Sequence, residues 1–356
     1  MPQQAGFYYG VSEDALTLTA STAQLISSAS GTYSAVANEC APATKYYYKA
    51  FMVVWNSDTH TYDTIESTVV NSFTTTESTP VSVGLPELPA YGSSDKVVTM
   101  YRTGGTSGTD ANRNYTFNYS TTYYSALWVA YPLTYADTQG NASHSGNWAY
   151  NTASGISNDY QVNVISNSYG ANYGNDVYSR GHQIPAADRK SDQTALDQTY
   201  LVTNQTPQMQ DQFNASVWST LEGKVRSLTS ASRPSEVIYV VTGPVYKTVN
   251  GNETITYLDA TSNSIKPSRV PVPNYYWKVL LKVKTNSSGA IVGASTIGFW
   301  YAHKPYGLSK GPDFKTFIKS VNEIEQLTGF NLFANLPDTY EERVEDNVSW
   351  SAFESF

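Results

Sequence analysis

Tyrosine is the residue type that most narrows the possible folds of this chain, with 29 tyrosines among 356 residues. Tyr and Thr favour β-strands, and the many Ser and Asn residues beside them favour turns. Hydrophobic residues make up 40% of the chain and charged residues 15%, which is typical of folded proteins rather than disordered ones. The length suits one large domain or two moderate ones. We therefore expect a β-rich globular protein.

Charge and the scarce cysteine and histidine exclude several classes of protein. The formal net charge is −8 and the pI is near 5.0, so the chain lacks the overall basic character of purely electrostatic nucleic-acid binders. A local basic cleft around a metal ion stays compatible with this balance. The single cysteine, Cys40, excludes an intrachain disulfide, and four histidines leave no Cys-rich or His-cluster zinc site. No apolar run has the length of a transmembrane helix.

The composition changes along the chain predict three segments. Residues 1–76 contain short strand-like runs separated by polar stretches. Residues 77–87 are rich in Pro, Ser and Thr, which predicts a linker. Residues 88–356 mix strand-like and helix-like stretches without a regular βαβ alternation. This pattern predicts an α+β domain with a mostly antiparallel sheet.

The first segment resembles part of a fibronectin type III module. The Tyr-rich run Lys45–Val54 and the closing run Ser67–Thr75, which contains SFTT, carry this resemblance. A β-sandwich of this type needs about seven strands, and the first two are missing before the strand-like run Gly6–Gly10. We therefore expect a partial β-sandwich module. We interpret the chain as the trimmed form of a longer exported protein, since its start also lacks a signal segment.

Alternating and apolar runs predict the elements of the second domain. Two helices are expected, at Asp211–Leu228 and Asp313–Thr328, the second ended by Gly329 as a C-cap. Five strands are expected: Tyr115–Tyr119, Leu127–Pro132, Tyr200–Thr203, Val237–Thr242 and Trp277–Lys284.

The segment around His182 carries the first chemistry-bearing side chains. Arg180-Gly181-His182 places a cation beside an imidazole, and histidine suits general-base work near neutral pH. Gly181 lets the backbone take an unusual conformation or approach a ligand. These residues form a candidate catalytic segment.

A helical pattern follows from Asn214 onward. Asn214, Trp218 and Glu222 stand at i, i+4 and i+8, a slowly drifting stripe on one side of the helix. Eight residues at a rise of ~1.5 Å span about 12 Å, so Asn214 and Glu222 are not expected to bind one ion directly together. Glu222 reaches such an ion through a water, since Mg²⁺ keeps several of its waters. Glu222 and Arg226 form an i, i+4 pair that would fix the guanidinium.

Together these segments resemble the DNA/RNA non-specific endonucleases of the His-Me finger (ββα-metal) class, the Serratia nuclease and endonuclease G type. The family motifs Asp-Arg-Gly-His, Asn-x-x-Pro-Gln and Asn-x-x-x-Trp-x-x-Leu-Glu correspond to Ser179–His182, Asn204–Gln208 and Asn214–Glu222. Family-like stretches also occur at Trp128–Tyr131, Val241–Pro244 and Val321–Gly329. Several spaced motifs in the right order are more specific than one short pattern. The resemblance implies a ββα-metal fold for residues 88–356.

The resemblance also implies roles for the candidate residues. His182 would activate a water to attack phosphorus, and Asn214 would be the sole direct protein ligand of Mg²⁺. Glu222 would hold a metal-bound water, and Arg180 and Arg226 would bind phosphate oxygens. The metal, with Mn²⁺ as an alternative, would stabilise the leaving 3′ oxygen. DNA and RNA would both be substrates.

Two departures from the family pattern affect the site. Ser179 stands where the family has Asp, and we expect it to alter the ordering of metal-bound water or the contact with substrate. The stretch His144–Trp148 lacks an Arg that the family usually has there. A phosphate contact is therefore either lost or supplied by another residue.

Simpler structural roles stay open for each candidate. A lone histidine such as His182 is often structural, Asn214 suits a helix N-terminus, and Glu222–Arg226 is a common surface pair. Arg189 and Lys190 either border a nucleic-acid cleft or are ordinary surface cations. The remaining histidines, His60, His144 and His303, are interpreted as background.

Two other functions and an unsettled setting remain at this point. One alternative is a catalytically degenerate, nuclease-like surface binding module, and another is a phosphodiesterase acting on small nucleotides. The fibronectin-like segment favours a secreted or cell-surface bacterial protein. Strand preference and oligomeric state stay open.

Overall fold

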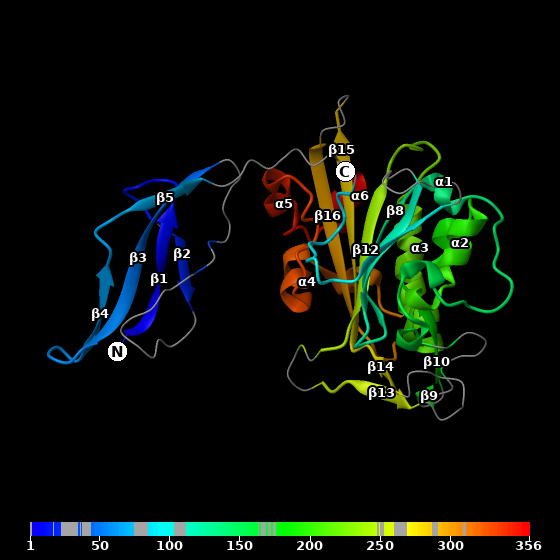
Figure 1. Cartoon of the computed structure of the whole chain (residues 1–356). Helices are drawn as coiled ribbons and strands as arrows, with labels where there is room; N and C mark the ends of the chain where they lie inside the picture. Colours follow the sequence, from blue (N-terminus) through cyan, green and yellow to red (C-terminus); the bar gives the residue numbers. More distant parts are fainter. Residues whose placement is uncertain are drawn as a thin grey trace. The chain divides into compact units, whose positions relative to one another are not determined.

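The computed structural model describes residues 2–16, 18–22, 35, 37, 44–74, 85–102, 112–162, 164, 169, 172–173, 176–247, 249, 253–259, 269–286, 291–308 and 311–356. The chain forms two compact units, Met1–Val81 and Ser82–Phe356 (Figure 1). Residues 77–84 of the predicted linker lie outside the described residues, as does Cys40.

The first unit contains one antiparallel sheet with strand order β2-β1-β3-β4, and β5 pairs with β3. Its strands are β1 (Pro2–Gly10), β2 (Leu18–Thr22), β3 (Lys45–Asn56), β4 (Thr61–Glu66) and β5 (Asn71–Thr74). The strand-like runs Gly6–Gly10 and Lys45–Val54 are thus confirmed. The closing strand occupies only part of the run Ser67–Thr75.

Aromatic side chains form the small core of this unit. Tyr9 and Tyr46 are buried, and the Tyr46 ring stacks on Phe73 with their centroids 5.6 Å apart. β4 is exposed along its whole length. Among the described residues of this unit no second sheet packs on the first, so the fibronectin-like sandwich stays a prediction.

The second unit is built on a seven-stranded sheet with the order β17-β16-β15-β12-β8-β7-β6, and all its pairs are antiparallel. The strands are β6 (Val97–Tyr101), β7 (Arg113–Ser120), β8 (Ser125–Leu133), β12 (Ile238–Val245), β15 (Tyr275–Thr285), β16 (Ile291–Ala302) and β17 (Ile318–Lys319). Four of the five predicted strands lie in β7, β8, β12 and β15. Helices accompany the sheet, which confirms the α+β class with mostly antiparallel pairing.

Smaller elements complete the second unit. One ribbon joins β9 (Asn172–Tyr173), β10 (Asp176–His182) and β11 (Gln205–Met209), and β13 (Thr256–Asp259) pairs with β14 (Arg269–Val272). The α-helices are α1 (Tyr135–Thr138), α2 (Gln193–Thr199), α3 (Ser219–Ser227), α4 (Val321–Thr328), α5 (Asp338–Val344) and α6 (Trp350–Ser355). Among the described residues, no helix combines the length and apolarity that crossing a membrane needs.

The sheet is buried on both faces because its strands alternate between two cores. In β12, Val240 packs in one core with Leu221 of α3, and Val241 packs in the other with Ile324 of α4. Figure 1 shows α3 and α4 on opposite sides of the sheet. All eight residues of β12 are buried, which explains why its sequence is a continuous apolar run instead of an alternating one.

The first predicted helix has the expected extent but two geometries. Gln210–Trp218 is a π-helical segment, and α3 continues it from Ser219. π-helical turns are rare and occur frequently at functional sites.

The second predicted helix, Asp313–Thr328, was wrong in its first half. Phe314–Phe317 forms a 3₁₀ turn, and the short strand β17 follows before α4 begins. A capping box sets that start, because Ser320 and Glu323 bond reciprocally to each other's backbone N–H at 3.1 and 3.0 Å. The predicted C-cap is confirmed, with Gly329 in the left-handed region at a φ of 82°.

The predicted strand Tyr200–Thr203 was also wrong. Val202–Asn204 forms a 3₁₀ turn, and the strand β11 begins at Gln205. The buried Asn204 side chain accepts from the Ile184 N–H at 3.0 Å and donates to the Ile184 and Thr199 carbonyls. Side-chain hydrogen bonds of this kind compete with strand pairing, so they favour the turn. They also tie the turn to the segment after His182.

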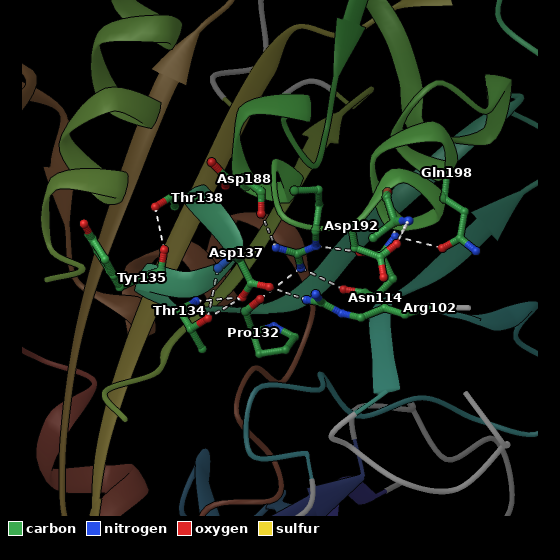
Figure 2. Close-up of polar contacts among 12 residues, drawn as sticks. Arg102, Asn114, Pro132, Thr134, Tyr135, Asp137, Thr138, Asp188, Asp192 and Gln198 are labelled. Atoms are coloured by element: carbon green, nitrogen blue, oxygen red, sulfur yellow. Dashed lines mark hydrogen bonds and ion pairs between the residues drawn. The ribbon is translucent and has the colours of Figure 1, made fainter. Parts of the chain in front are cut away.

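Arg189 is not a surface cation beside a cleft, because its side chain is completely buried. Its guanidinium donates to the Asn114 side chain and carbonyl and to the Pro132 carbonyl, at 2.5 to 2.9 Å. It also donates to the carbonyl of Asp188 at 2.7 Å. Figure 2 shows Asn114, Pro132 and Asp188 close together. Arg189 therefore ties the segment that follows His182 to β7 and β8.

An ion pair between Arg102 and Asp137 lies beside this network in Figure 2. Arg102 donates to Asp137 at 2.5 Å, and the other Asp137 oxygen accepts from the Thr134 N–H and hydroxyl. The guanidinium groups of Arg189 and Arg102 and these hydrogen bonds hold the pKa of Asp137 below its usual range, although burial opposes them. This carboxylate caps α1 at its first turn.

We predict that Arg189→Met lowers the free energy of unfolding by at least about 3 kcal/mol, because several buried oxygens lose their donor. The matched control is Arg233→Met, which removes a half-exposed guanidinium that pairs with Glu236 at 3.1 Å. That variant should stay within about 0.5 kcal/mol of the wild type. Denaturant titration measures both, and an equal loss in the two variants would contradict the structural role of Arg189.

Candidate active site

The strand pair β10–β11 and the helical segment after it carry all six candidate residues. Ser179, Arg180 and His182 lie on β10, and β11 pairs with this strand in register from Tyr178 to His182. The buried Asp176 carboxylate accepts from the backbone N–H groups of Asp211 and Gln212 at 2.9 to 3.1 Å. An anion at free N–H groups fixes where the helical segment starts relative to β10.

Gly181 is required by close packing rather than by an unusual backbone angle. A Cβ atom at this position would lie 2.2 Å from side-chain atoms of the buried Gln208. Gln208 belongs to β11, and its side chain packs over Gly181 of the paired strand β10, where the absence of a side chain leaves room for it. This contact fixes the backbone between Arg180 and His182.

His182 lies against two aromatic rings. The Trp148 and Tyr200 ring centroids are 4.6 and 4.9 Å from the imidazole centroid. Its Nε2 atom is buried and has no hydrogen-bond partner among the described residues. Burial, and after it the charges of Arg180 and His144, lower the pKa of His182 to about 4. The imidazole is therefore neutral, and able to accept a proton, across the physiological pH range.

Arg180 lies on the same side of β10 as His182, two residues earlier. Its guanidinium carbon is 5.5 Å from the centroid of the Trp148 ring, a cation–π contact. Trp148 thus packs against Arg180 and His182, two of the three candidate side chains on this strand.

Asn214 and Ser179, two of the candidate residues, contact each other. The Asn214 amide nitrogen donates to the Ser179 hydroxyl at 3.4 Å and to the Gln210 side chain at 3.2 Å. The amide oxygen takes part in neither contact, and oxygen is the atom that Mg²⁺ prefers. No group of three or more His, Cys, Asp or Glu side chains that suits a metal occurs in the described part of the chain. The amide oxygen of Asn214 therefore fits as the ligand of a hard cation that keeps most of its water ligands.

Arg226 is fixed by Asp188, a residue that the sequence analysis did not single out. The guanidinium donates to one Asp188 oxygen at 2.9 Å, and the Tyr131 hydroxyl donates to the other at 3.0 Å. The expected hydrogen bond from Arg226 to Glu222 is not among those of the described residues. Arg226 remains partly exposed, so its remaining donors can face a ligand.

Glu222 is partly buried among Lys278, Asp188 and Arg226. Burial and the charge of Asp188 raise the pKa of Glu222 to about 7, although Lys278 and Arg226 act in the opposite direction. The carboxyl therefore titrates near neutral pH. Perturbed carboxyl groups of this kind mark functional sites more often than ordinary surfaces.

Lys278 is the cation that the sequence analysis missed. It belongs to β15 and is 1% exposed, and its ammonium lies 5.0 Å from the Trp218 ring centroid without a hydrogen-bond partner among the described residues. Burial lowers the pKa of Lys278 to about 8, against the opposing effects of Glu222 and Asp188. The signal in the sequence is a lysine inside the apolar run YYWKVLL.

His303, which the sequence led us to interpret as background, has a structural role at the end of β11. Its Nδ1 donates to the Pro273 carbonyl at 2.9 Å, and its Nε2 accepts from the Met209 N–H at 3.1 Å. This pair of contacts requires the neutral ring. Burial lowers the pKa of His303 to about 4, although the Pro273 bond and Asp176 raise it.

Comparison with known proteins finds relatives of the part of the chain that contains this site. A sequence model described as DNA/RNA non-specific endonuclease matches residues 93–339. A nuclease of Serratia marcescens is 34% identical over 239 residues, which cover 66% of this chain and 79% of that protein. Nuclease 1, mitochondrial, of Schizosaccharomyces pombe is 31% identical over 163 residues, 45% of this chain and 47% of the relative. Endonuclease G, mitochondrial, of Bos taurus is 27% identical over 205 residues, 56% and 63% of the two chains.

The chain spans 47%, 62% and 66% of the lengths of three matched curated relatives, the fission-yeast protein and two fungal nucleases. Among solved structures, the EndoG/EndoGI complex matches with a TM-score of 0.47 and 23% identity, over 62% of this chain and 84% of that chain.

We predict that acid destabilises the protein through His182 and His303. Each folded-state pKa lies near 4, below the usual value of about 6.5, so the unfolded chain binds more protons between these values. The free energy of unfolding should therefore fall as the pH decreases from about 6.5 to about 4.

The variant His303→Gln removes one of these groups. Its loss of stability between pH 7 and pH 4.5 should be smaller than that of the wild type by about 2 kcal/mol. His60→Gln, in an exposed turn of the first unit, is the control and should lose as much stability as the wild type. Denaturant titration at the two pH values gives these differences, and an unchanged loss in His303→Gln would show that the neutral ring is not the cause.

Proposed function

The chain belongs to the DNA/RNA non-specific endonuclease family, and from this premise we propose that it is a metal-dependent endonuclease that hydrolyses the phosphodiester bonds of both DNA and RNA. One observation carries the proposal. A strand pair followed by a helical segment holds a neutral His182 on the same strand as Ser179, which contacts Asn214. This order of elements is what a ββα-metal site requires.

His182 acts as the general base in this proposal. Its pKa of about 4 leaves the ring unprotonated at neutral pH, so it accepts a proton from the water that attacks phosphorus. Because Nε2 is buried, Nδ1 is the nitrogen that accepts this proton, and Nε2 carries the fixed one.

The amide oxygen of Asn214 would hold the metal, Mg²⁺ or Mn²⁺, since both favour oxygen ligands. When bound, the metal stabilises the charge that develops on the leaving 3′ oxygen. Glu222 in its ionised form orients water near the cation, which the positive charges of Lys278 and Arg226 favour. Ser179 orients the Asn214 amide through its hydroxyl.

Arg180 and Arg226 bind the substrate phosphate. Arg226 is held by its hydrogen bond to Asp188, and the guanidinium of Arg180 packs against the Trp148 ring. Two preorganised cations at one site stabilise charge that builds up on phosphate oxygens during hydrolysis. They also supply local positive charge on a chain whose net charge is −8.

The setting of this activity stays a prediction. The relatives include a bacterial nuclease and mitochondrial nucleases, so they support neither export nor an organelle alone. We retain the secreted or cell-surface bacterial protein as the proposal, with the first unit as the accessory module.

The proposal predicts cleavage of both plasmid DNA and RNA in the presence of Mg²⁺ and none with EDTA. His182→Ala and Asn214→Ala should each reduce the rate at least about 100-fold, because one removes the base and the other the metal ligand. His60→Ala, in the first unit, is the control and should retain the full rate. Wild-type protein that cuts neither polymer with Mg²⁺ or Mn²⁺ would overturn the nuclease proposal. Cleavage of small phosphodiesters alone would favour the small-nucleotide alternative.

A second prediction concerns Ser179. Ser179→Asp adds a negative charge beside the proposed cation, so it should lower the Mg²⁺ concentration that gives half-maximal activity by about tenfold. The opposite variant, Ser179→Ala, removes only the hydroxyl and should raise this concentration slightly. Activity is measured across a Mg²⁺ titration at constant ionic strength. Equal midpoints for all three proteins would place the cation away from Ser179.

A further inference from the structure

His144 lies between two groups that only accept hydrogen bonds. Its Nδ1 is 2.9 Å from a carboxylate oxygen of Asp197, and its Nε2 is 3.2 Å from the carbonyl oxygen of Asn147. A neutral imidazole has one N–H group and donates only once. Both contacts are therefore hydrogen bonds only when the ring carries two protons and a positive charge.

The partners of His144 connect a loop to a helix. Asn147 belongs to the same loop as His144, and Asp197 belongs to α2. Gln193, one turn earlier on α2, donates to the same Asp197 oxygen at 3.0 Å and to the Ser143 carbonyl at 3.1 Å. The loop is thus attached to α2 through two neighbouring side chains, and Asp197 joins them.

Ring contacts lead from His144 to His182. The His144 ring stacks on Tyr200 with centroids 4.0 Å apart and an angle of 13°. Tyr200 meets the His182 ring edge-on at 4.9 Å and the Trp148 ring at 5.4 Å. A cation over an aromatic face is attracted by the ring, so the charged form of His144 strengthens this stack.

Trp148 completes the connection, because it follows Asn147 directly in the chain. It is 5% exposed and packs on the His182 ring, with the Arg180 guanidinium over its own ring. The next residue, Ala149, exchanges backbone hydrogen bonds with Tyr200 and Val202 at 3.1 and 2.9 Å. The loop position that His144 fixes is therefore the position of the side chain that supports both Arg180 and His182.

We propose that His144 is a positioning residue of the nuclease site, which through its contacts with Asp197 and Asn147 holds Trp148 against His182 and Arg180. This inference rests on the proposed function and extends it to the stretch where the family Arg is absent. The charged and titratable groups around His144 are Asp197, which accepts its hydrogen bond, Tyr200, which stacks on its ring, and Arg180 and His182, which lie beyond Trp148 and Tyr200. Loss of one proton removes one of the two contacts and loosens the loop.

Nuclear magnetic resonance of ¹⁵N-labelled histidine tests this directly, because the chain has four histidines. The signals that disappear in His144→Phe identify His144, and those that disappear in His182→Ala identify His182. Across a series of pH values, any change in the His144 signals should be accompanied by a change in the His182 signals with the same midpoint. His182 signals that do not follow those of His144 would overturn the proposal.

Two variants remove the contact from opposite sides. His144→Phe keeps a ring on Tyr200 without donors, and Asp197→Ala removes the acceptor on α2. Both should shift the His182 signals at constant pH and lower kcat about tenfold or more, since small displacements of reacting groups are costly. His60→Phe is the control and should change neither. Thermal unfolding identifies any variant that has lost its fold.

The two proposals fail separately. Unshifted His182 signals in folded His144→Phe and Asp197→Ala would overturn the positioning role, whatever the nuclease activity. A wild-type protein without nuclease activity would overturn the proposed function, and the signals would still show whether His144 positions His182.

Discussion

Burial of both faces of the seven-stranded sheet is the constraint on which the candidate site depends. A strand covered on both sides exposes no face to water, so any charge it carries is buried, and this burial is costly unless an opposite charge lies nearby. Lys278 is such a charge on β15, with Glu222 and Asp188 as the acidic groups nearby. The sheet thus brings a cation beneath the helical segment that carries Asn214 and Glu222, and the opposite charges stabilise one another only in the folded protein.

Local sequence patterns predicted the elements that are determined locally. Apolar runs identified β8, β12 and β15, and the alternating run Tyr115–Tyr119 identified β7. The spaced motifs predicted Ser179, Arg180, His182 and Asn214, which lie on β10 and on the helical segment that follows β11. The errors occurred where side chains from elsewhere decide the backbone. At Val202–Asn204, hydrogen bonds of the Asn204 side chain to Ile184 and Thr199 favour a turn where the run Tyr200–Thr203 had predicted a strand.

The residues that sequence reasoning missed act through distant partners. Arg189 looked like a surface cation beside Lys190, but its four acceptors come from β7, from the end of β8 and from its own neighbour. The role of Asp188 depends on its hydrogen bond with Arg226, which lies 38 positions later in the chain. His144 and Asp197 are 53 residues apart, and no pattern within either stretch predicts that they meet. Only the chain's path through the sheet and around α2 makes these pairs.

Burial acts on the two titratable candidates in chemically opposite ways. For His182 it favours the neutral form, which is the form a base needs, so burial and function agree. For Glu222 it favours the protonated form, which has an O–H donor and no negative charge to orient a metal-bound water, so burial and the proposed role conflict. Lys278 and Arg226 offset this conflict, and positive charge from a bound cation would act in the same direction. A bound cation would therefore favour the ionised form of Glu222, which links metal binding to the protonation state that the proposed role needs.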